Sequence, residues 1–312
     1  MYFDNIIGQS FAKKYLKSSI NNDKLNSAYM FEGIDGIGKK KMAYELAKIL
    51  LEIEHPENSP DYIEVFPNGN SVKVDQIRKL QSDIIIKPHN KYKIYILNNA
   101  EKMTVEAQNA LLKTLEEPPQ YAIIILVTNN KEALLDTIKS RCDIVKFNSI
   151  PHNEMVGYLV QNGVEEKKAT LLTSFSRGSL ERALDLANST EFTDMRDDVQ
   201  KYIKVLFDKN TVDILELPND IDKYKSEIID LLDIIIDYFR DIVLLKERVD
   251  RDMLINIDKI TFLESISIKI TYSQVSRIIG IIEEAKKKSR SNCNFNINMQ
   301  VMFLNIYEVI KW

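Results

Sequence analysis

The sequence predicts an α/β fold with a parallel sheet, followed by helical regions. Three observations lead to this fold class. In the first half of the 312-residue chain, short apolar segments alternate with segments of helical periodicity. The segment "AIIILVT" (Ala122–Thr128) is apolar on both faces, which is typical of a buried strand between helical layers. After about Asn148, strand-like segments stop and the remaining chain is helical in pattern.

The first strand is expected at "AYMF" (Ala28–Phe31), directly before a glycine-rich loop. The helix after that loop is predicted from apolar residues at helical spacing, namely Met42, Ala43, Leu46, Ala47 and Leu50. A second strand is expected at "YKIYIL" (Tyr92–Leu97) and the third at Ala122–Thr128.

The segment "TVEAQNALLKTLEE" predicts a helix between the second and third strands. Thr104 is the expected N-cap, and the prolines Pro118 and Pro119 end the helix. One apolar stripe faces the core: Ala107, Ala110, Leu111 and Leu115.

Three domains are expected: an α/β domain over residues 1–148, a small helical domain over 149–189 and a larger helical domain over 190–312. The apolar run from Ile228 to Leu245 carries five charged residues, so it predicts a mostly buried helix rather than a membrane span. Near the C-terminus, four residues at helical spacing are expected to pack in a core: Met299, Met302, Phe303 and Ile306.

Composition is that of an ordinary globular protein, with 45% hydrophobic and 28% charged residues. The formal net charge of −4 argues against nucleic-acid binding by bulk charge, although a local basic face is compatible with it. Two cysteines cannot form a disulfide framework, which fits a reducing cytoplasm. The N-terminal segment lacks the pattern of a secretory signal, so we expect a cytoplasmic protein without a membrane anchor.

The stretch "GIDGIGKKK" (Gly33–Lys41) resembles a phosphate-binding loop between a strand and a helix. Its candidate nucleotide-binding residues are Gly33, Gly36, Ile37, Gly38, Lys39 and Lys40. In such loops the residue after the lysine is Ser or Thr, whose hydroxyl binds magnesium. Lys40 stands there instead. The alternative is a tight strand-to-helix turn without a ligand.

The stretch "KIYILNNAEKM" places Asn98 and Asn99 after an apolar strand. Nucleoside triphosphatases of this kind have Asp and Glu there, for metal support and for positioning the attacking water. The chain therefore lacks three groups on which phosphoryl transfer depends, and we expect it not to hydrolyse ATP. Because the loop keeps its glycines and Lys39, weak, metal-free binding of ATP or ADP stays an alternative.

Further motifs make the resemblance specific. "NALLKTLEEPP" (Asn109–Pro119), followed by "SRC" (Ser140–Cys142), resembles the clamp-loader branch of the AAA+ proteins, whose core is a RecA-like P-loop domain. "IIGQ" (Ile6–Gln9) resembles that family's N-terminal box, and "GSLERAL" (Gly178–Leu184) its second-sensor helix. An intact "SRC" beside a degraded nucleotide site most resembles subunits of the delta-prime type in bacterial DNA polymerase III.

The resemblance implies that Arg141 acts in trans, as an arginine reaching the ATP of a neighbouring subunit. The alternative is an ordinary surface ion pair. Ser140 and Cys142 are expected only to shape the turn, with Cys142 packing as a small apolar residue. The first-sensor position falls on Thr128 or Asn129, and the second-sensor arginine on Arg182; structural roles are the alternatives.

The resemblance further implies that residues 149–189 form a lid and residues 190–312 a collar that joins subunits of a hetero-pentamer. Expected partners are gamma/tau-like and delta-like subunits and, through the complex, the sliding clamp and primer-template DNA. Lys102 and Lys113 are only candidates for DNA contact. No cofactor is required. No zinc is expected, because "LEIEHPENSPDYIEVFP", where many relatives carry a four-cysteine module, has no cysteine.

Two other functions were weighed. An active gamma/tau-type ATPase is disfavoured by Lys40, Asn98 and Asn99. A free-standing nucleic-acid-binding module with this fold is disfavoured by the length of the chain and by "SRC", since a trans arginine needs a neighbour.

Overall fold

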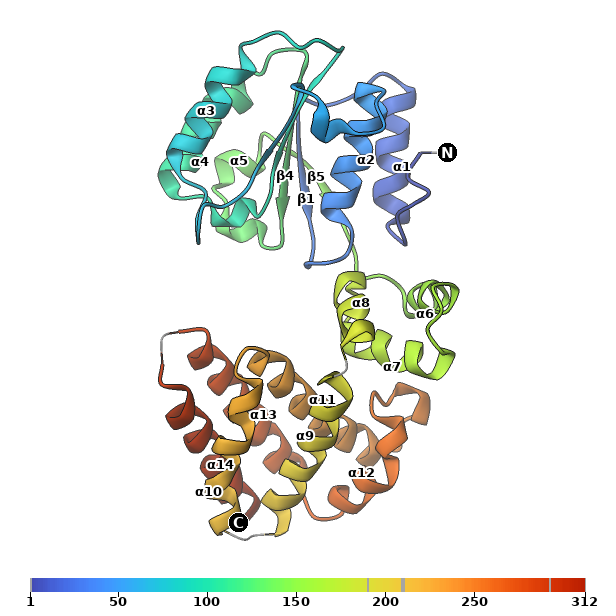
Figure 1. Cartoon of the computed structure of the whole chain (residues 1–312), viewed down its shortest axis with the longest axis vertical. Helices are drawn as coiled ribbons and strands as arrows, with labels where there is room; N and C mark the ends of the chain where they lie inside the picture. The colour runs from blue at the N-terminus through green and yellow to red at the C-terminus, as the bar shows by residue number, and fades with distance from the viewer. Residues whose placement is uncertain (1, 190, 209–210, 292, 312) are drawn as a thin grey trace. The chain divides into compact units, whose positions relative to one another are not determined.

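The computed structural model describes residues 2–189, 191–208, 211–291 and 293–311 (Figure 1). The chain forms two compact units, Met1–Ala187 and Asn188–Trp312. The three-domain division at 148/149 and 189/190 stays a prediction, and its residues Met1, Thr190 and Trp312 lie outside the described part of the chain.

The first unit contains a sheet of five parallel strands in the order β2-β3-β4-β1-β5, which confirms the predicted fold class. The strands are β1 (Ala28–Glu32), β2 (Tyr62–Val65), β3 (Lys93–Leu97), β4 (Ala122–Thr128) and β5 (Asp143–Lys146). All seven residues of β4 are buried, because β4 lies between β3 and β1 with helices over both faces.

Helices cover the two faces of the sheet (Figure 1). One core contains residues of α1 (Ser10–Asn21) and α2 (Lys39–Leu51). The other contains residues of α3 (Val74–Ile84), α4 (Val105–Glu116) and α5 (Asp136–Lys139). Alternate residues of the central strands enter opposite cores: Tyr29 and Phe31 face the first, and Met30 the second.

The predicted helix after the second strand is confirmed as α4. The Thr104 hydroxyl accepts a hydrogen bond from the Ala107 backbone N–H at 3.2 Å, as expected of an N-cap. Ala107, Leu111 and Leu115 are buried, while Ala110 is only partly buried. The segments β2, β5 and α3 were not predicted from the sequence.

Three helices complete the first unit: α6 (His152–Gln161), α7 (Glu166–Ser176) and α8 (Leu180–Asn188, whose last residue belongs to the second unit). They follow β5 in the chain and are called the lid helices below. Short 3₁₀ turns η1 (Pro56–Asn58), η2 (Ala100–Lys102) and η3 (Lys131–Ala133) lie in the loops of the α/β part.

In the described residues the second unit is helical. Its helices are α9 (Glu191–Asp208), α10 (Thr211–Ile221), α11 (Ile228–Lys246), α12 (Ile260–Ser267), α13 (Tyr272–Ser289) and α14 (Phe295–Lys311), with 3₁₀ turns η4 (Asp222–Tyr224), η5 (Arg251–Met253) and η6 (Ile257–Lys259). As expected, α11 is buried on most sides. Its Asp241 is fully buried and accepts backbone N–H groups of Ile255 and Asn256 at 3.1 and 2.7 Å.

The apolar pattern of α14 is also confirmed as core, since Met299, Met302, Phe303 and Ile306 are each 2% exposed or less. None of the helices within the described residues is both long and apolar enough to cross a membrane.

Candidate functional site

The glycine-rich loop connects β1 to α2 at the carboxyl edge of the sheet. Gly36 adopts φ +73°, and a Cβ there would overlap the Ser179 hydroxyl and lie 2.8 Å from the Glu181 Cβ. Only glycine lets the loop adopt this backbone and lie so close to the lid helix α8. The Ile37 side chain, in contrast, is 1% exposed and belongs to the core, so only its backbone borders the loop surface.

Lys39 is the candidate phosphate-binding lysine, and its ammonium group is turned back onto its own loop. Its Nζ donates to the carbonyl oxygens of Gly33 and, at 2.6 Å, of Ile34. It also lies 3.6 Å from the Asp35 carboxylate. The side chain is 5% exposed, and burial lowers the pKa of Lys39. The cation thus has three partners within its own loop.

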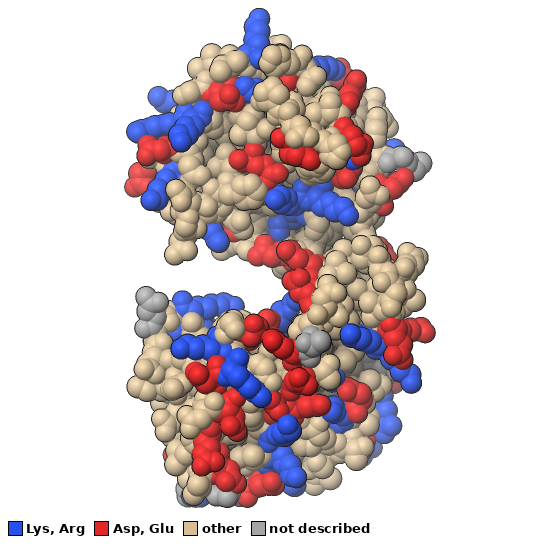
Figure 2. All heavy atoms as spheres, viewed as in Figure 1, with Lys and Arg blue, Asp and Glu red and all other residues tan. Residues whose placement is uncertain are grey.

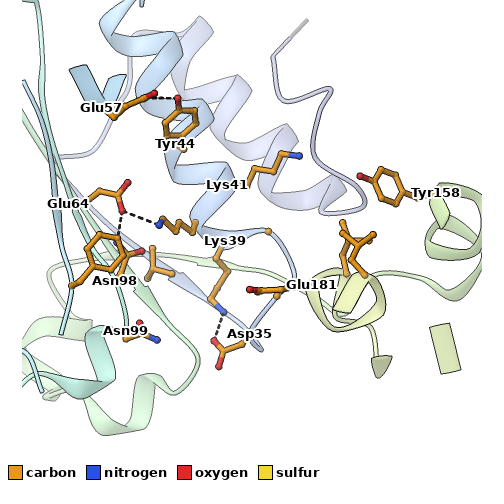
Figure 3. A pocket seen from close by; sticks show the side chains of 17 residues that line it. Asp35, Lys39, Lys41, Tyr44, Glu57, Glu64, Asn98, Asn99, Tyr158 and Glu181 are labelled. Carbon is orange, nitrogen blue, oxygen red and sulfur yellow. Dashed lines mark hydrogen bonds and ion pairs between the residues drawn. The ribbon is translucent and has the colours of Figure 1, made fainter. Parts of the chain in front are cut away.

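The loop opens onto a pocket of about 960 Å³ (Figure 3). Its walls come from the loop, α2, β2, the ends of β3 and β4, and the lid helices: Asp35, Gly36, Gly38, Lys39, Lys40, Lys41, Tyr44, Glu57, Glu64, Phe66, Asn98, Asn99, Val127, Tyr158, Leu180, Glu181 and Leu184. The lid contacts the loop directly, since the Glu181 backbone N–H donates to the Gly36 carbonyl at 3.2 Å. The negative charge of Glu181 faces Lys39.

Lys40 and Asn98, which stand where magnesium-binding groups were expected, meet at one carboxylate. The Lys40 ammonium is 3.4 Å from Glu64 Oε2, and the Asn98 amide donates to the same oxygen at 3.0 Å. The Tyr62 hydroxyl donates to the other Glu64 oxygen. Burial and this carboxylate raise the pKa of Tyr62. Lys40 also lies 4.6 Å from the centre of the Phe66 ring.

The sensor and water-positioning candidates at the strand ends are tied to two further acids. The Thr128 hydroxyl donates to Glu101 at 2.9 Å, and the Asn99 amide approaches the same carboxylate at 3.4 Å. The Asn129 amide donates to Asp35 at 2.7 Å. The structure therefore brings the loop, Asn98, Asn99 and the first-sensor positions to one edge of the sheet.

Arg182 lies on the same lid helix as Glu181 but is placed differently. Leu180, Glu181 and Leu184 of α8 line the pocket, whereas Arg182 is half-buried outside its lining. Its backbone N–H donates to the Ser179 hydroxyl at 3.3 Å. A second-sensor role for Arg182 stays a prediction.

Arg141 lies at the opposite edge of the sheet from the loop. It lies two residues before the start of β5, whereas the loop follows β1, and these two strands are parallel neighbours. Because a strand rises about 3.3 Å per residue, roughly 13–16 Å of sheet separates the two edges. The guanidinium lies 2.7 Å from Glu116 and donates to the Thr137 carbonyl at 3.0 Å. The surface ion pair weighed as an alternative role is thus present.

The flanking residues of "SRC" support the turn. The Ser140 hydroxyl donates to the Thr137 carbonyl at 3.1 Å. Cys142 is partly buried against the second core, and burial raises the pKa of its thiol to about 12. The thiol is therefore protonated at neutral pH, and Cys142 packs as a small apolar residue.

Comparison with known proteins identifies the family of this chain. The family model described as DNA polymerase III, delta subunit, matches residues 8–151. The chain is 30% identical to DNA polymerase III subunit delta' of Bacillus subtilis (strain 168) over 318 aligned positions, covering 95% of both chains. The chain belongs to the DNA polymerase III clamp-loader family.

Other members of the clamp-loader family are also similar. The chain is 31% identical to DNA polymerase III subunit tau of Bacillus subtilis (strain 168), over 78% of this chain and 50% of that one. A solved structure of a gamma subunit-related protein from Thermotoga maritima aligns with a TM-score of 0.44 at 19% identity, covering 95% of this chain and 99% of the other.

In this clamp-loader subunit the sequence did not reveal the acidic residues around the loop: Asp35, Glu64, Glu101 and Glu181. Asp35, Glu101 and Glu181 lie within the recognised motifs, whereas Glu64 lies outside them and comes to the site because β2 pairs with β3. Within the described residues, no group of three or more His, Cys, Asp or Glu side chains is placed to hold a metal ion. The expectation of no zinc stays a prediction.

Proposed function

We propose that this clamp-loader subunit is of the delta-prime type, does not hydrolyse ATP and supplies Arg141 to the ATP site of a neighbouring subunit. The observation that carries the proposal is the position of Arg141. It lies across the sheet from the chain's own loop, so it cannot reach a phosphate held there. An arginine at that edge serves phosphoryl transfer only if a second subunit brings its nucleotide there.

The chemistry of the pocket supports the absence of turnover. At the two magnesium-binding positions the chain offers an ammonium group and an amide N–H, both directed at Glu64. These donors do not fit a divalent cation, which needs oxygen ligands. Lys39 would have to exchange its loop carbonyls and Asp35 for phosphate oxygens. We propose that the pocket requires no cofactor, with weak metal-free binding of ATP or ADP left as the most it supports.

The residues at the nucleotide site support the delta-prime type over the gamma/tau type, because Lys40, Asn98 and Asn99 replace groups on which phosphoryl transfer depends. Identity to the two Bacillus subtilis subunits is similar, at 30% and 31%, so the choice between the two types rests on these three positions. We further propose partners of the gamma/tau and delta types in a hetero-pentamer that acts on the sliding clamp and primer-template DNA.

The test is the ATPase rate of rebuilt clamp-loader complexes in the presence of clamp and primed DNA. Arg141→Ala is expected to lower turnover by at least tenfold, because a trans arginine is worth about 10³–10⁵ in other nucleotide hydrolases. Lys39→Ala is expected to leave turnover within about twofold. Arg78→Ala is a matched control, since Arg78 is an exposed arginine on α3 whose guanidinium pairs with Asp75.

The opposite pattern would favour the gamma/tau-type alternative. If Lys39→Ala lowers turnover and Arg141→Ala leaves it unchanged, the chain's own loop hydrolyses ATP and the proposal is wrong. Loss of turnover in Arg78→Ala as well would show that the arginine effect is not specific to position 141.

A further inference from the structure

The Arg141 guanidinium contacts the carboxyl end of α4 and the short helix α5. Its Nη2 is 2.7 Å from Oε1 of Glu116, the last residue of α4. Its Nη1 donates at 3.0 Å to the carbonyl oxygen of Thr137 in α5. The two side chains remain 34% and 49% exposed, so solvent and a second protein surface both have access to the pair.

Helix stability does not explain a glutamate at the carboxyl end of α4. The carboxyl end of a helix carries partial negative charge, so an acidic side chain in the last turn of α4 is disfavoured. This end of α4 therefore attracts a cation, and the cation it contacts is the arginine of the "SRC" turn.

A carboxylate and a phosphate compete for the same guanidinium. Arginine binds phosphate best through two parallel N–H donors of its planar fork. With Nη2 paired to Glu116 and Nη1 to Thr137, both terminal nitrogens are already engaged. A phosphate approaching them also meets the negative charge of Glu116, which repels it. Full engagement of a phosphate thus weakens the contact with Glu116.

Resting on the trans role of Arg141 proposed above, we propose that Glu116 is a restraining residue for that arginine. Its carboxylate holds Arg141 on its own subunit until the phosphate of the neighbour's nucleotide competes for it. Exposed ion pairs contribute little, so the restraint is modest, equivalent to about a two- to fivefold shift between held and released arginine. The phosphate of the neighbour's nucleotide can overcome a preference of this size for the held position of Arg141.

The experiment measures ATP turnover in rebuilt complexes without clamp and DNA, where Arg141 spends most time on its own subunit. Glu116→Gln is expected to raise this basal turnover about two- to fivefold, because the amide keeps the shape but loses the charge. Glu117→Gln, the same change at the next residue, is the matched control and is expected to leave it unchanged. Raising the salt concentration should shrink the effect of Glu116→Gln, since exposed pairs are screened.

Two further variants separate restraint from structural damage. Glu116→Asp keeps the charge and is expected to stay near the wild-type basal rate. The double variant Glu116→Gln with Arg141→Ala is expected to behave like Arg141→Ala alone, because the carboxylate acts only through the arginine.

The outcomes also distinguish this inference from the function on which it rests. If Arg141→Ala lowers turnover but Glu116→Gln fails to raise the basal rate, the restraint is disproved and the trans role stands. If Glu116→Gln and Glu117→Gln raise the rate equally, general charge is responsible and the restraint is again disproved. If Arg141→Ala leaves turnover unchanged, the trans role itself is wrong.

Discussion

Among the side chains of the pocket, Glu64 contacts both residues that stand at the expected magnesium-binding positions. It joins Lys40 of the loop helix to Asn98 at the end of β3. Lys40 is 57% exposed, so its ion pair contributes at most about 1 kcal/mol to stability. Asn98 is 4% exposed, and losing its partner would leave a buried amide unsatisfied, at a cost of about 1–3 kcal/mol. The hydrogen bond from Asn98 therefore contributes most of the stability at Glu64, while Lys40 adds a positive charge beside the Glu64 carboxylate.

Asp198 in the second unit allows a prediction of pH dependence. Burial alone would raise its pKa, but hydrogen bonds from Lys201, Lys223 and Tyr224 outweigh burial and lower the pKa to about 2. A carboxyl group with a depressed pKa stabilises the fold above its unfolded pKa of about 3.9, and this contribution is lost as pH falls through the folded value.

We therefore expect Asp198→Asn to lower the free energy of unfolding by about 1–2 kcal/mol at pH 7, a range reduced because both lysines are exposed. The difference from wild type should decline as pH falls from about 4 toward 2. Urea titrations at several pH values measure it. A difference that stays constant across that range would mean that Asp198 acts through packing rather than charge.

At the scale of elements, the loop and the lid helix α8 are held together by close backbone approach. The Glu181 N–H donates to the Gly36 carbonyl of the loop at 3.2 Å, and the Ser179 hydroxyl would overlap a Cβ on Gly36. These contacts leave no room for a side chain on Gly36. Steric fit and a main-chain hydrogen bond thus hold the lid helix α8 against the loop.

Gly36→Ala tests this contact between the loop and α8. Its control is a substitution at Gly69, which has a similar positive φ but open surroundings. Gly69 has φ +66° with nothing within 4 Å of a built Cβ, so Gly69→Ala should cost only the left-handed strain, about 1–2 kcal/mol. Gly36→Ala adds overlap with Ser179 and Glu181, and we expect it to cost at least about 1 kcal/mol more, measured by urea unfolding.

A second variant tests whether overlap with Ser179 causes the loss of stability in Gly36→Ala. Ser179→Gly removes the nearest obstructing hydroxyl, so combined with Gly36→Ala it should recover part of the lost stability. Equal costs for the two single glycine changes would show that the lid does not press on the loop in solution.

At the scale of the whole molecule, positive and negative charges are nearly balanced in number. The chain has 42 Lys and Arg against 46 Asp and Glu, and on the face shown in Figure 2 both signs are interspersed over each unit. Nucleic-acid-binding proteins concentrate positive charge on one surface, because phosphate neutralisation supplies most of their affinity. A DNA role for this subunit is therefore expected to come through the assembled complex.

We expect the isolated chain to bind primer-template DNA with a Kd weaker than about 10⁻⁴ M at physiological salt, the weak end of non-specific binding. Fluorescence anisotropy over a range of salt concentrations measures this, with Lys102→Ala and Lys113→Ala expected to change nothing in the isolated chain. Micromolar affinity with a steep salt dependence would instead favour the nucleic-acid-binding module.

Local sequence pattern predicts a strand correctly where the pattern is strong. The strand Ala122–Thr128 was predicted with its observed bounds, and the strands at Ala28 and Tyr92 were each predicted to within one residue at one end. It failed for β2 and β5, which have four residues each. Such segments are too short to show a period, and pairing with β3 and β1 decides their conformation.

The sequence by itself determined the fold class, the glycine loop with Lys40, the Asn98–Asn99 pair after a strand, the N-cap of α4 and the helical second half, because each depends on residues close together in the chain. Only the tertiary structure decided that Glu64 joins Lys40 to Asn98, and that Arg141 lies with Glu116 across the sheet from the loop. These contacts link residues far apart in sequence, and the strand order and the packing of helices on the sheet bring them together.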